Sequence, residues 1–220
     1  MRTVRGVRIG LVLVLALALT GSALADHLDP KERIRAADQV RAKAMLVRQS
    51  DLPGFQRQPS SGQDPHLTCA GLDESDLTVT GDAEAPNWGL SVVFVTSSST
   101  VYATRSDADT SWKRGTSGAG VRCLREELGR EFAKQGARVV SLRRVPFPAL
   151  AQRSAAYRLT LTATSRGQTI NGYVDFVVLM HGRAVAGLVL GSALVQPDRP
   201  AEVRLARTLA GRMAKAMRGA

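Results

Sequence analysis

The clearest pattern in the chain is a two-residue alternation of apolar and polar positions in its last third. Residues 157–162 alternate strictly, and because successive residues of a strand point to opposite faces, they predict a sheet with one buried face. We expect strands over residues 137–145, 155–164, 172–179 and 184–190. Arg166-Gly167 and His181-Gly182 fall where tight turns would join these strands into an antiparallel meander.

Helical spacing governs most of the remaining sequence. Apolar residues recur every three or four positions over 198–217, which predicts an amphipathic helix, and two further helices are predicted over 106–113 and 121–135. The inner stripe of the last helix consists of Leu205, Ala206, Leu209, Ala210, Met213 and Met217.

A first helix is expected near the start of the mature chain. Asp29 can cap it, and Pro30 suits the first helical position. Pro53-Gly54 would end the helical stretch. The apolar stripe of this helix would consist of Ile34, Ala37, Val40, Ala44 and Val47.

Strands are also predicted over 77–80 and 90–104, the second as one strand or as a pair interrupted by the serines at 97–99. The order is therefore helix, strands, helices, consecutive strands and a last helix. Consecutive strands joined by short turns favour an antiparallel sheet over a nucleotide-binding βαβ fold. We expect an α+β fold, a twisted antiparallel sheet with helices packed on it, in a single domain over residues 26–220.

Residues 1–25 have the pattern of a secretory signal peptide. Three arginines at positions 2, 5 and 8 precede an apolar core over 9–19, and Ala23-Leu24-Ala25 offers a small-x-small cleavage site. The apolar run is shorter than the ~20 residues that a membrane-spanning helix needs. We expect export of a mature chain that begins at Asp26, with an uncleaved membrane anchor as the alternative.

The chain is basic, with 30 lysines and arginines against 19 acidic residues and a formal net charge of +11. The arginine-rich, alanine-rich composition is typical of a GC-rich bacterial genome, and an exported protein meets little nucleic acid. We therefore expect no nucleic-acid partner, and consider contact with an anionic envelope or membrane surface instead. The candidate binding residues are the outward-facing cations of the last helix, Arg204, Arg207, Lys215 and Arg218.

Cys69 and Cys123 are the only two cysteines of the chain. In an oxidising compartment such a pair is expected to form a disulfide, which would stabilise the fold by roughly 4 kcal/mol in the chain-entropy model. A redox pair is the alternative, although the Cys-x-x-Cys spacing that lowers a thiol pKa is absent.

No catalytic or metal-binding motif stands out, and we expect no catalytic residues, metal or cofactor. The chain has three histidines, His27, His66 and His181, and a hydrolase triad through His66 stays an alternative. The acidic stretch 73–84 lacks the spacing of a calcium loop, and a solvated acidic face explains it better. The glycine-rich stretch 115–120 could cradle an anion at a helix start, but a flexible connector is the simpler interpretation.

Several short motifs give the chain a family resemblance. They are Asp51-Leu52-Pro53-Gly54-Phe55, Cys69-Ala70-Gly71, Ser75-Asp76-Leu77, Thr80-Gly81, Cys123-Leu124 and the Arg/Ala/Leu-rich last helix. With these motifs the chain resembles the exported PsbP-like α/β sandwich proteins of actinobacteria, which overlap with PknH-type sensor domains. It lacks the lipidated cysteine of the lipoprotein members and the kinase of the receptors. The resemblance implies a binding or accessory domain of the cell envelope and supplies no catalytic residues.

These observations predict an exported, non-enzymatic binding module of the bacterial cell envelope. Its ligand would be a lipid, a glycan or a protein, held on the sheet or in a pocket between sheet and helix. An accessory protein that acts through its basic surface, with peripheral contact to a membrane, is the second hypothesis, and a hydrolase with an unrecognised triad is the third. The sequence does not indicate an oligomeric state.

Overall fold

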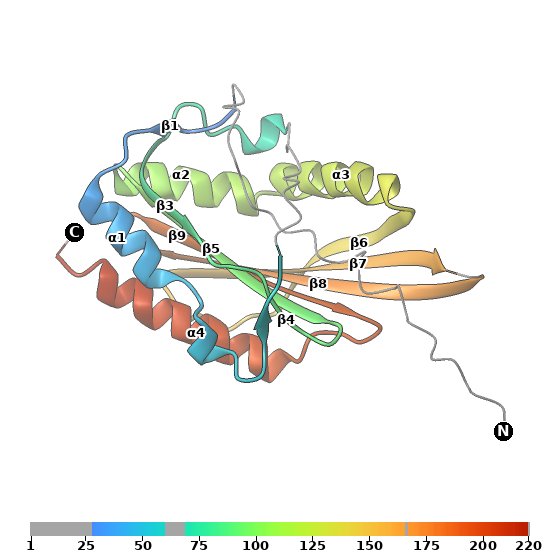
Figure 1. The fold of residues 1–220 in the computed structure, drawn as a ribbon. Helices are drawn as coiled ribbons and strands as arrows, with labels where there is room; N and C mark the ends of the chain where they lie inside the picture. The colour runs from blue at the N-terminus through green and yellow to red at the C-terminus, as the bar shows by residue number, and fades with distance from the viewer. Residues whose placement is uncertain (1–27, 60–68, 166, 220) are drawn as a thin grey trace.

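The computed structural model describes residues 28–59, 69–165 and 167–219 (Figure 1). The expected signal peptide over 1–25, His27 and His66 lie outside these residues. None of the described helices is long and apolar enough to cross a membrane.

Within the described residues, nine strands form one sheet in the order β1-β3-β5-β9-β8-β7-β6, with β2 and β4 joined to the β5 side. Every pair is antiparallel except β1 with β3. The strands are β1 (Lys31–Glu32), β2 (Gln56–Arg57), β3 (Thr78–Glu84), β4 (Trp88–Leu90), β5 (Val93–Tyr102), β6 (Ala137–Val145), β7 (Arg153–Ser165), β8 (Gln168–His181) and β9 (Ala184–Ala193).

Helices cover both faces of this sheet (Figure 1). On one face lie α1 (Ala36–Met45) and α4 (Arg199–Ala216), and on the other lie α2 (Arg105–Thr116) and α3 (Gly118–Lys134). Two short 3-10 turns, η2 (Gln49–Asp51) and η3 (Ala70–Leu72), join the elements. The α+β prediction of a mostly antiparallel sheet with packed helices is confirmed.

Each face of the sheet has its own apolar core, because neighbouring residues of a strand point to opposite sides. On β9, Leu188 and Leu190 pack under α1 and α4, whereas Val185 and Val189 belong to the core under α2 and α3. The six residues predicted to form the inner stripe of α4 are all buried. That helix begins as expected, because the Asp198 side chain accepts a hydrogen bond from the Ala201 N–H at 3.0 Å.

The prediction for the first helix is wrong in its start and in its buried face. Lys31 and Arg33 donate backbone hydrogen bonds to β3 as a parallel strand, so the helix begins only at Ala36. The predicted stripe residues Ile34 and Val40 are exposed. The residues that α1 buries instead are Asp38, Ala42 and Met45.

The serines at 97–99 do not interrupt a strand, because β5 runs through them without a break. Ser97 Oγ accepts a hydrogen bond from the Val47 N–H at 2.9 Å, and Ser99 Oγ donates to the Ala42 carbonyl at 2.7 Å. These bonds satisfy buried hydroxyls and tie β5 to α1. The glycine-rich stretch 115–120 is also not a flexible connector, since only Ser117 separates α2 from α3.

The predicted disulfide is confirmed: Cys69 is bonded to Cys123, which lies on α3. The bridge joins η3 to the helices on the face of the sheet away from α4.

Candidate functional site

A cavity of about 460 Å³ opens between the sheet and the first half of α4. Three segments that are far apart in the sequence enclose it. Its lining residues are Asp51, Leu52, Pro53, Phe55, Val93, Val95, Leu190, Ser192, Val195, Gln196, Pro197, Asp198, Ala201, Arg204, Leu205 and Thr208. The volume lies within the range of small-ligand pockets, and most of the lining is apolar, as in such pockets.

The ends of β5 and β9 form the floor of the cavity. Val93 pairs with Ser192 and Val95 pairs with Leu190, so these four side chains stand side by side on the same face of β5 and β9. Three of these residues, Val95, Leu190 and Ser192, are buried, and Val93 is partly exposed. Since α4 begins at Arg199, the cavity lies under the first half of this helix.

One wall is the turn that follows η2, the Asp51-Leu52-Pro53-Gly54-Phe55 motif. Gly54 has a φ of +82°, a left-handed conformation that favours glycine, and Leu52 turns inward and is buried. Arg212 of α4 donates to both oxygens of Asp51, at 2.6 and 2.8 Å, and also to the Leu46 carbonyl. Burial works to raise the pKa of Asp51, but the hydrogen bonds from Arg212 and Arg48 outweigh it and lower that pKa.

The opposite wall is the connection from β9 to α4. Leu194 has a φ of +78°, which is strained for a residue with a side chain, and its N–H donates to the Asn171 carbonyl at 2.9 Å. This conformation turns the chain so that Val195, Gln196 and Pro197 border the cavity before Asp198 caps α4.

Buried charges lie directly beside the cavity. Arg158 donates two hydrogen bonds to the fully buried Asp175, and a third to Gln196 in the cavity wall. Above them Glu202 of α4 is also fully buried, and Arg199 donates to its Oε2 at 2.7 Å. Burial raises the pKa of Glu202, and the charge of Asp175 adds to this effect. Among the described residues, Glu202 Oε1 has no hydrogen-bond partner.

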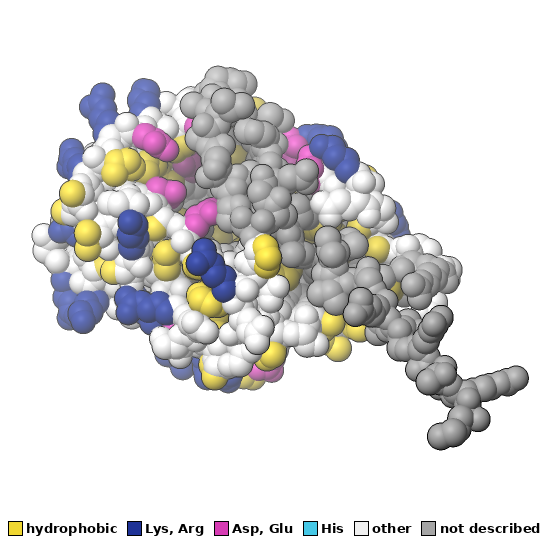
Figure 2. All heavy atoms as spheres, viewed as in Figure 1, with side chains coloured by type: hydrophobic (Ala, Val, Ile, Leu, Met, Phe, Trp, Pro, Cys, Tyr) yellow, Lys and Arg dark blue, Asp and Glu magenta, His cyan; other side chains and the backbone are white. Residues whose placement is uncertain are grey.

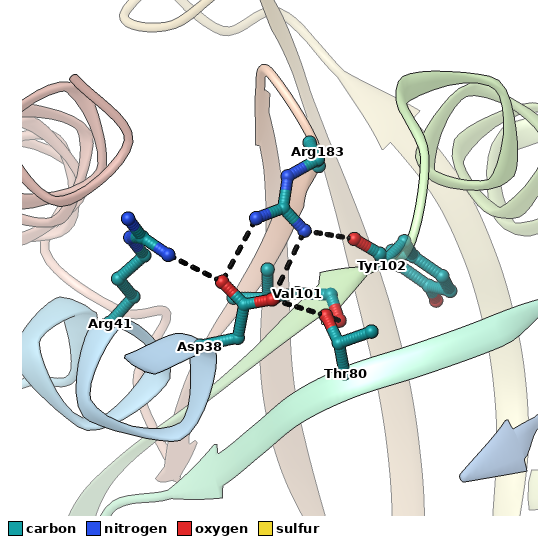
Figure 3. Close-up of polar contacts among 6 residues, drawn as sticks. All are labelled: Asp38, Arg41, Thr80, Val101, Tyr102 and Arg183. Carbon is teal, nitrogen blue, oxygen red and sulfur yellow. Dashed lines mark hydrogen bonds and ion pairs between the residues drawn. The ribbon is translucent and has the colours of Figure 1, made fainter. Parts of the chain in front are cut away.

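A second buried ion network fixes the helix that leads into the Asp51 turn (Figure 3). Asp38 of α1 accepts hydrogen bonds from Arg183, Arg41 and Thr80, and Arg183 also donates to the Tyr102 carbonyl. Burial works to raise the pKa of Asp38, but these donors outweigh it and lower the pKa to about 2. The network therefore joins α1 to β3 and to the turn between β8 and β9.

The acidic stretch 73–84 is only partly solvated. Asp76 forms a bidentate ion pair with Arg114, while Glu74 accepts a hydrogen bond from Tyr102 at 2.9 Å. Burial raises the pKa of Glu74, and burial together with the charge of Glu74 raises that of Tyr102. In the described part of the chain, no group of three or more metal-ligating side chains comes together.

The four cations that the sequence indicates are all exposed: Arg204, Arg207 and Lys215 lie on α4, and Arg218 follows its end. Only Arg204 borders the cavity, whereas Arg207, Lys215 and Arg218 continue along the helix. The sequence does not indicate Asp51 and Arg212 as site residues, because the two are 161 positions apart. The signal that could have indicated a site is the adjacent apolar pair Leu194-Val195 between a strand and a helix cap, where polar residues are usual.

Comparison with known proteins gives distant matches in structure alone. No protein-family model and no curated protein sequence matches the chain. One similar structure is LpqN, which is involved in cell envelope biogenesis of Mycobacterium tuberculosis; it is 12% identical over 72% of this chain and 76% of that chain, with a TM-score of 0.28. Another is PA94 of Pseudomonas aeruginosa, a protein of unknown function described as a putative regulator; it is 12% identical over 74% of this chain and 93% of that chain, with a TM-score of 0.23.

Proposed function

We propose that this chain is an exported, non-enzymatic binding module of the bacterial cell envelope, and that the cavity under α4 is its ligand site. The observation that carries the proposal is the cavity itself, with about 460 Å³ of space over an apolar floor. An apolar floor favours a hydrocarbon group, because burying apolar surface contributes roughly 25 cal/mol per Å². The polar groups at its edge, Arg204, Gln196 and Thr208, would orient the polar end of such a ligand.

Export is supported by two independent features. The disulfide between Cys69 and Cys123 is typical of proteins that fold outside the reducing cytoplasm. The first 25 residues have the charge and apolar pattern of a secretory signal.

Among the proposed ligands, the structure favours the lipid over the glycan. Sugar recognition relies on many hydrogen-bonding side chains, but the cavity floor consists of Val93, Val95, Leu190 and a single hydroxyl, that of Ser192. An acyl chain needs no hydrogen bonds from this floor.

The test uses the neutral apolar dye N-phenylnaphthylamine as the probe. Trp88 packs in the same apolar core as Leu52, Val95 and Leu205, which line the cavity, whereas Trp112 belongs to the core on the other face. In a Trp112→Phe protein, dye in the cavity should therefore receive excitation energy from Trp88, the remaining tryptophan of the two.

Two phenylalanine variants of α4 make the test specific. Ala201→Phe places a ring in the cavity, whereas Ala214→Phe adds the same ring to the same helix at a residue that does not line it. We expect saturable energy transfer that Ala201→Phe weakens at least tenfold and Ala214→Phe leaves unchanged. Equal binding by both variants would mean that the dye binds elsewhere, and the proposed function would fail.

A further inference from the structure

We propose that the mouth of the cavity is a membrane-contact surface that docks on an anionic lipid bilayer. In this arrangement the exposed Leu90, Leu194 and Val195, here called the apolar rim, enter the interfacial layer, while Arg204 and Arg207 contact the lipid headgroups. The inference rests on the proposed function, because it gives the cavity a route by which an acyl chain could enter and leave.

Of the apolar rim, Val195 lines the cavity, and Leu90 and Leu194 lie next to the ends of the floor strands. Leu90 pairs with Val93, so both side chains point to the cavity face of the sheet, and Ser192 of β9 lies next in register. The Ala193 N–H donates to the Val92 carbonyl, which brings the start of the β9–α4 connection beside the β4–β5 turn. The exposed fractions of Leu90, Leu194 and Val195 are 46%, 60% and 59%.

Two turns at the rim have an unusual backbone conformation. Leu194 and Ser91, which adjoin the floor strands, both have positive φ values, +78° and +55°. Neither residue is a glycine, so each of these turns carries a conformational cost. In this conformation the Leu194 side chain is exposed next to Val195.

The cations beside the rim complement an anionic surface. Arg204 borders the cavity together with Val195, and Arg207 lies about one turn further along α4. In the described structure, neither guanidinium is in an ion pair. Glu202, the acidic residue of α4, is fully buried, whereas the exposed carboxylate of Asp198 caps the start of the helix and accepts a hydrogen bond from the Ala201 N–H. Figure 2 shows basic and apolar side chains emerging together along the edge of the molecule that α4 forms.

The size of the patch favours a bilayer over a protein partner. A stable protein interface buries about 800 Å² per partner and needs a central anchor, and three aliphatic side chains around an opening supply neither. Peripheral membrane binding needs only a few inserted apolar groups together with basic residues, which an anionic surface attracts.

The experiment measures co-sedimentation of the mature protein with vesicles of phosphatidylcholine alone or mixed with phosphatidylglycerol. We expect binding to the anionic vesicles that weakens with salt and is much weaker on the neutral ones. Removing two charges in Arg204→Gln/Arg207→Gln should weaken binding at least tenfold. Leu194→Ser/Val195→Ser should weaken it severalfold while the protein keeps its circular dichroism spectrum.

The matched control is Arg143→Gln/Arg144→Gln, which removes two exposed cations from β6. It should change binding less than twofold. Equal losses in both double variants would show general charge attraction and overturn the docking surface, as would capture of a protein partner with no vesicle binding. Failure of vesicle binding while the dye still enters the cavity would reject the docking surface alone. Vesicle binding without dye binding would reject the proposed function.

Discussion

Arg212 of α4 and Asp51 of the η2 turn, 161 positions apart, form a bidentate ion pair at one wall of the cavity, with distances of 2.6 and 2.8 Å. The same guanidinium donates to the Leu46 carbonyl at the end of α1. One side chain therefore holds together the three segments α1, the turn and α4, and it fixes the wall that Leu52 and Phe55 contribute.

Arg212→Met should lower the free energy of unfolding by about 2–3 kcal/mol, because it leaves a mostly buried carboxylate without its partner. Urea unfolding at neutral pH measures this loss. Arg207→Met, on the exposed side of the same helix, serves as the control and should stay within about 0.5 kcal/mol of the wild type. Similar losses in the two variants would mean that the ion pair does not hold the wall.

Asp38 should make the protein sensitive to acid. Its pKa of about 2 lies below the ordinary aspartate value of 3.8, so its stabilising contribution is present above pH 3.8 and is lost as the pH falls toward about 2. The difference corresponds to about 2 kcal/mol. Asp38→Asn should therefore be destabilised at neutral pH, by a margin that shrinks as the pH approaches 2. Urea unfolding between pH 7 and pH 2 measures this difference in the free energy of unfolding. A difference that stays constant with pH would refute the role of the carboxylate charge.

Glu202 should have the opposite pH dependence. Because its folded-state pKa is raised, its stabilising contribution is complete below the ordinary glutamate value of 4.5 and is lost as the pH rises through the folded-state pKa. Glu202→Gln keeps an acceptor for Arg199 but carries no charge. We expect this variant to gain stability relative to the wild type as the pH rises from about 4.5 to neutral. A thermal unfolding series would contradict the account if the relative stability fell instead.

The disulfide should contribute about 4 kcal/mol, since it closes a loop between positions separated by 54 residues. Cys69→Ala/Cys123→Ala should lower the urea midpoint accordingly, and the wild type should fall to a similar midpoint under reducing conditions. The dye should still bind the variant under native conditions, because the bridge lies on the face of the sheet away from α4. Loss of dye binding by a folded variant would show that the bridge shapes the cavity.

The sequence predicts the buried face of a helix correctly where that face is apolar along its whole length. The predicted inner stripe of α4 is correct, because its six apolar residues are all buried. The stripe of α1 was wrong because this helix buries Asp38, whose partner Arg183 is 145 positions away. No local periodicity can indicate that an aspartate faces inward when the cation that neutralises it comes from a distant turn.

The sequence predicts a pocket between sheet and helix only as one possible ligand site, and the position and lining of the cavity could not be predicted for a similar reason. Its floor consists of strand residues with the same alternation as the rest of the sheet, and the pattern does not show where α4 starts relative to the strand ends. The sequence indicates Arg204 as an exposed cation of the last helix. Its position at the cavity follows only from the packing of α4 beside Val195. The pairing of Asp51 with Arg212 likewise depends on the fold as a whole.

The most direct test of the binding-module account is native mass spectrometry of the protein purified without detergent from the organism that makes it. The account predicts an added mass that is lost on denaturation, on wild type and Ala214→Phe but absent from Ala201→Phe. The intact mass would also show whether the chain begins at Asp26. A bare wild-type protein, or an added mass that persists on Ala201→Phe, would contradict the assignment of the cavity as the ligand site.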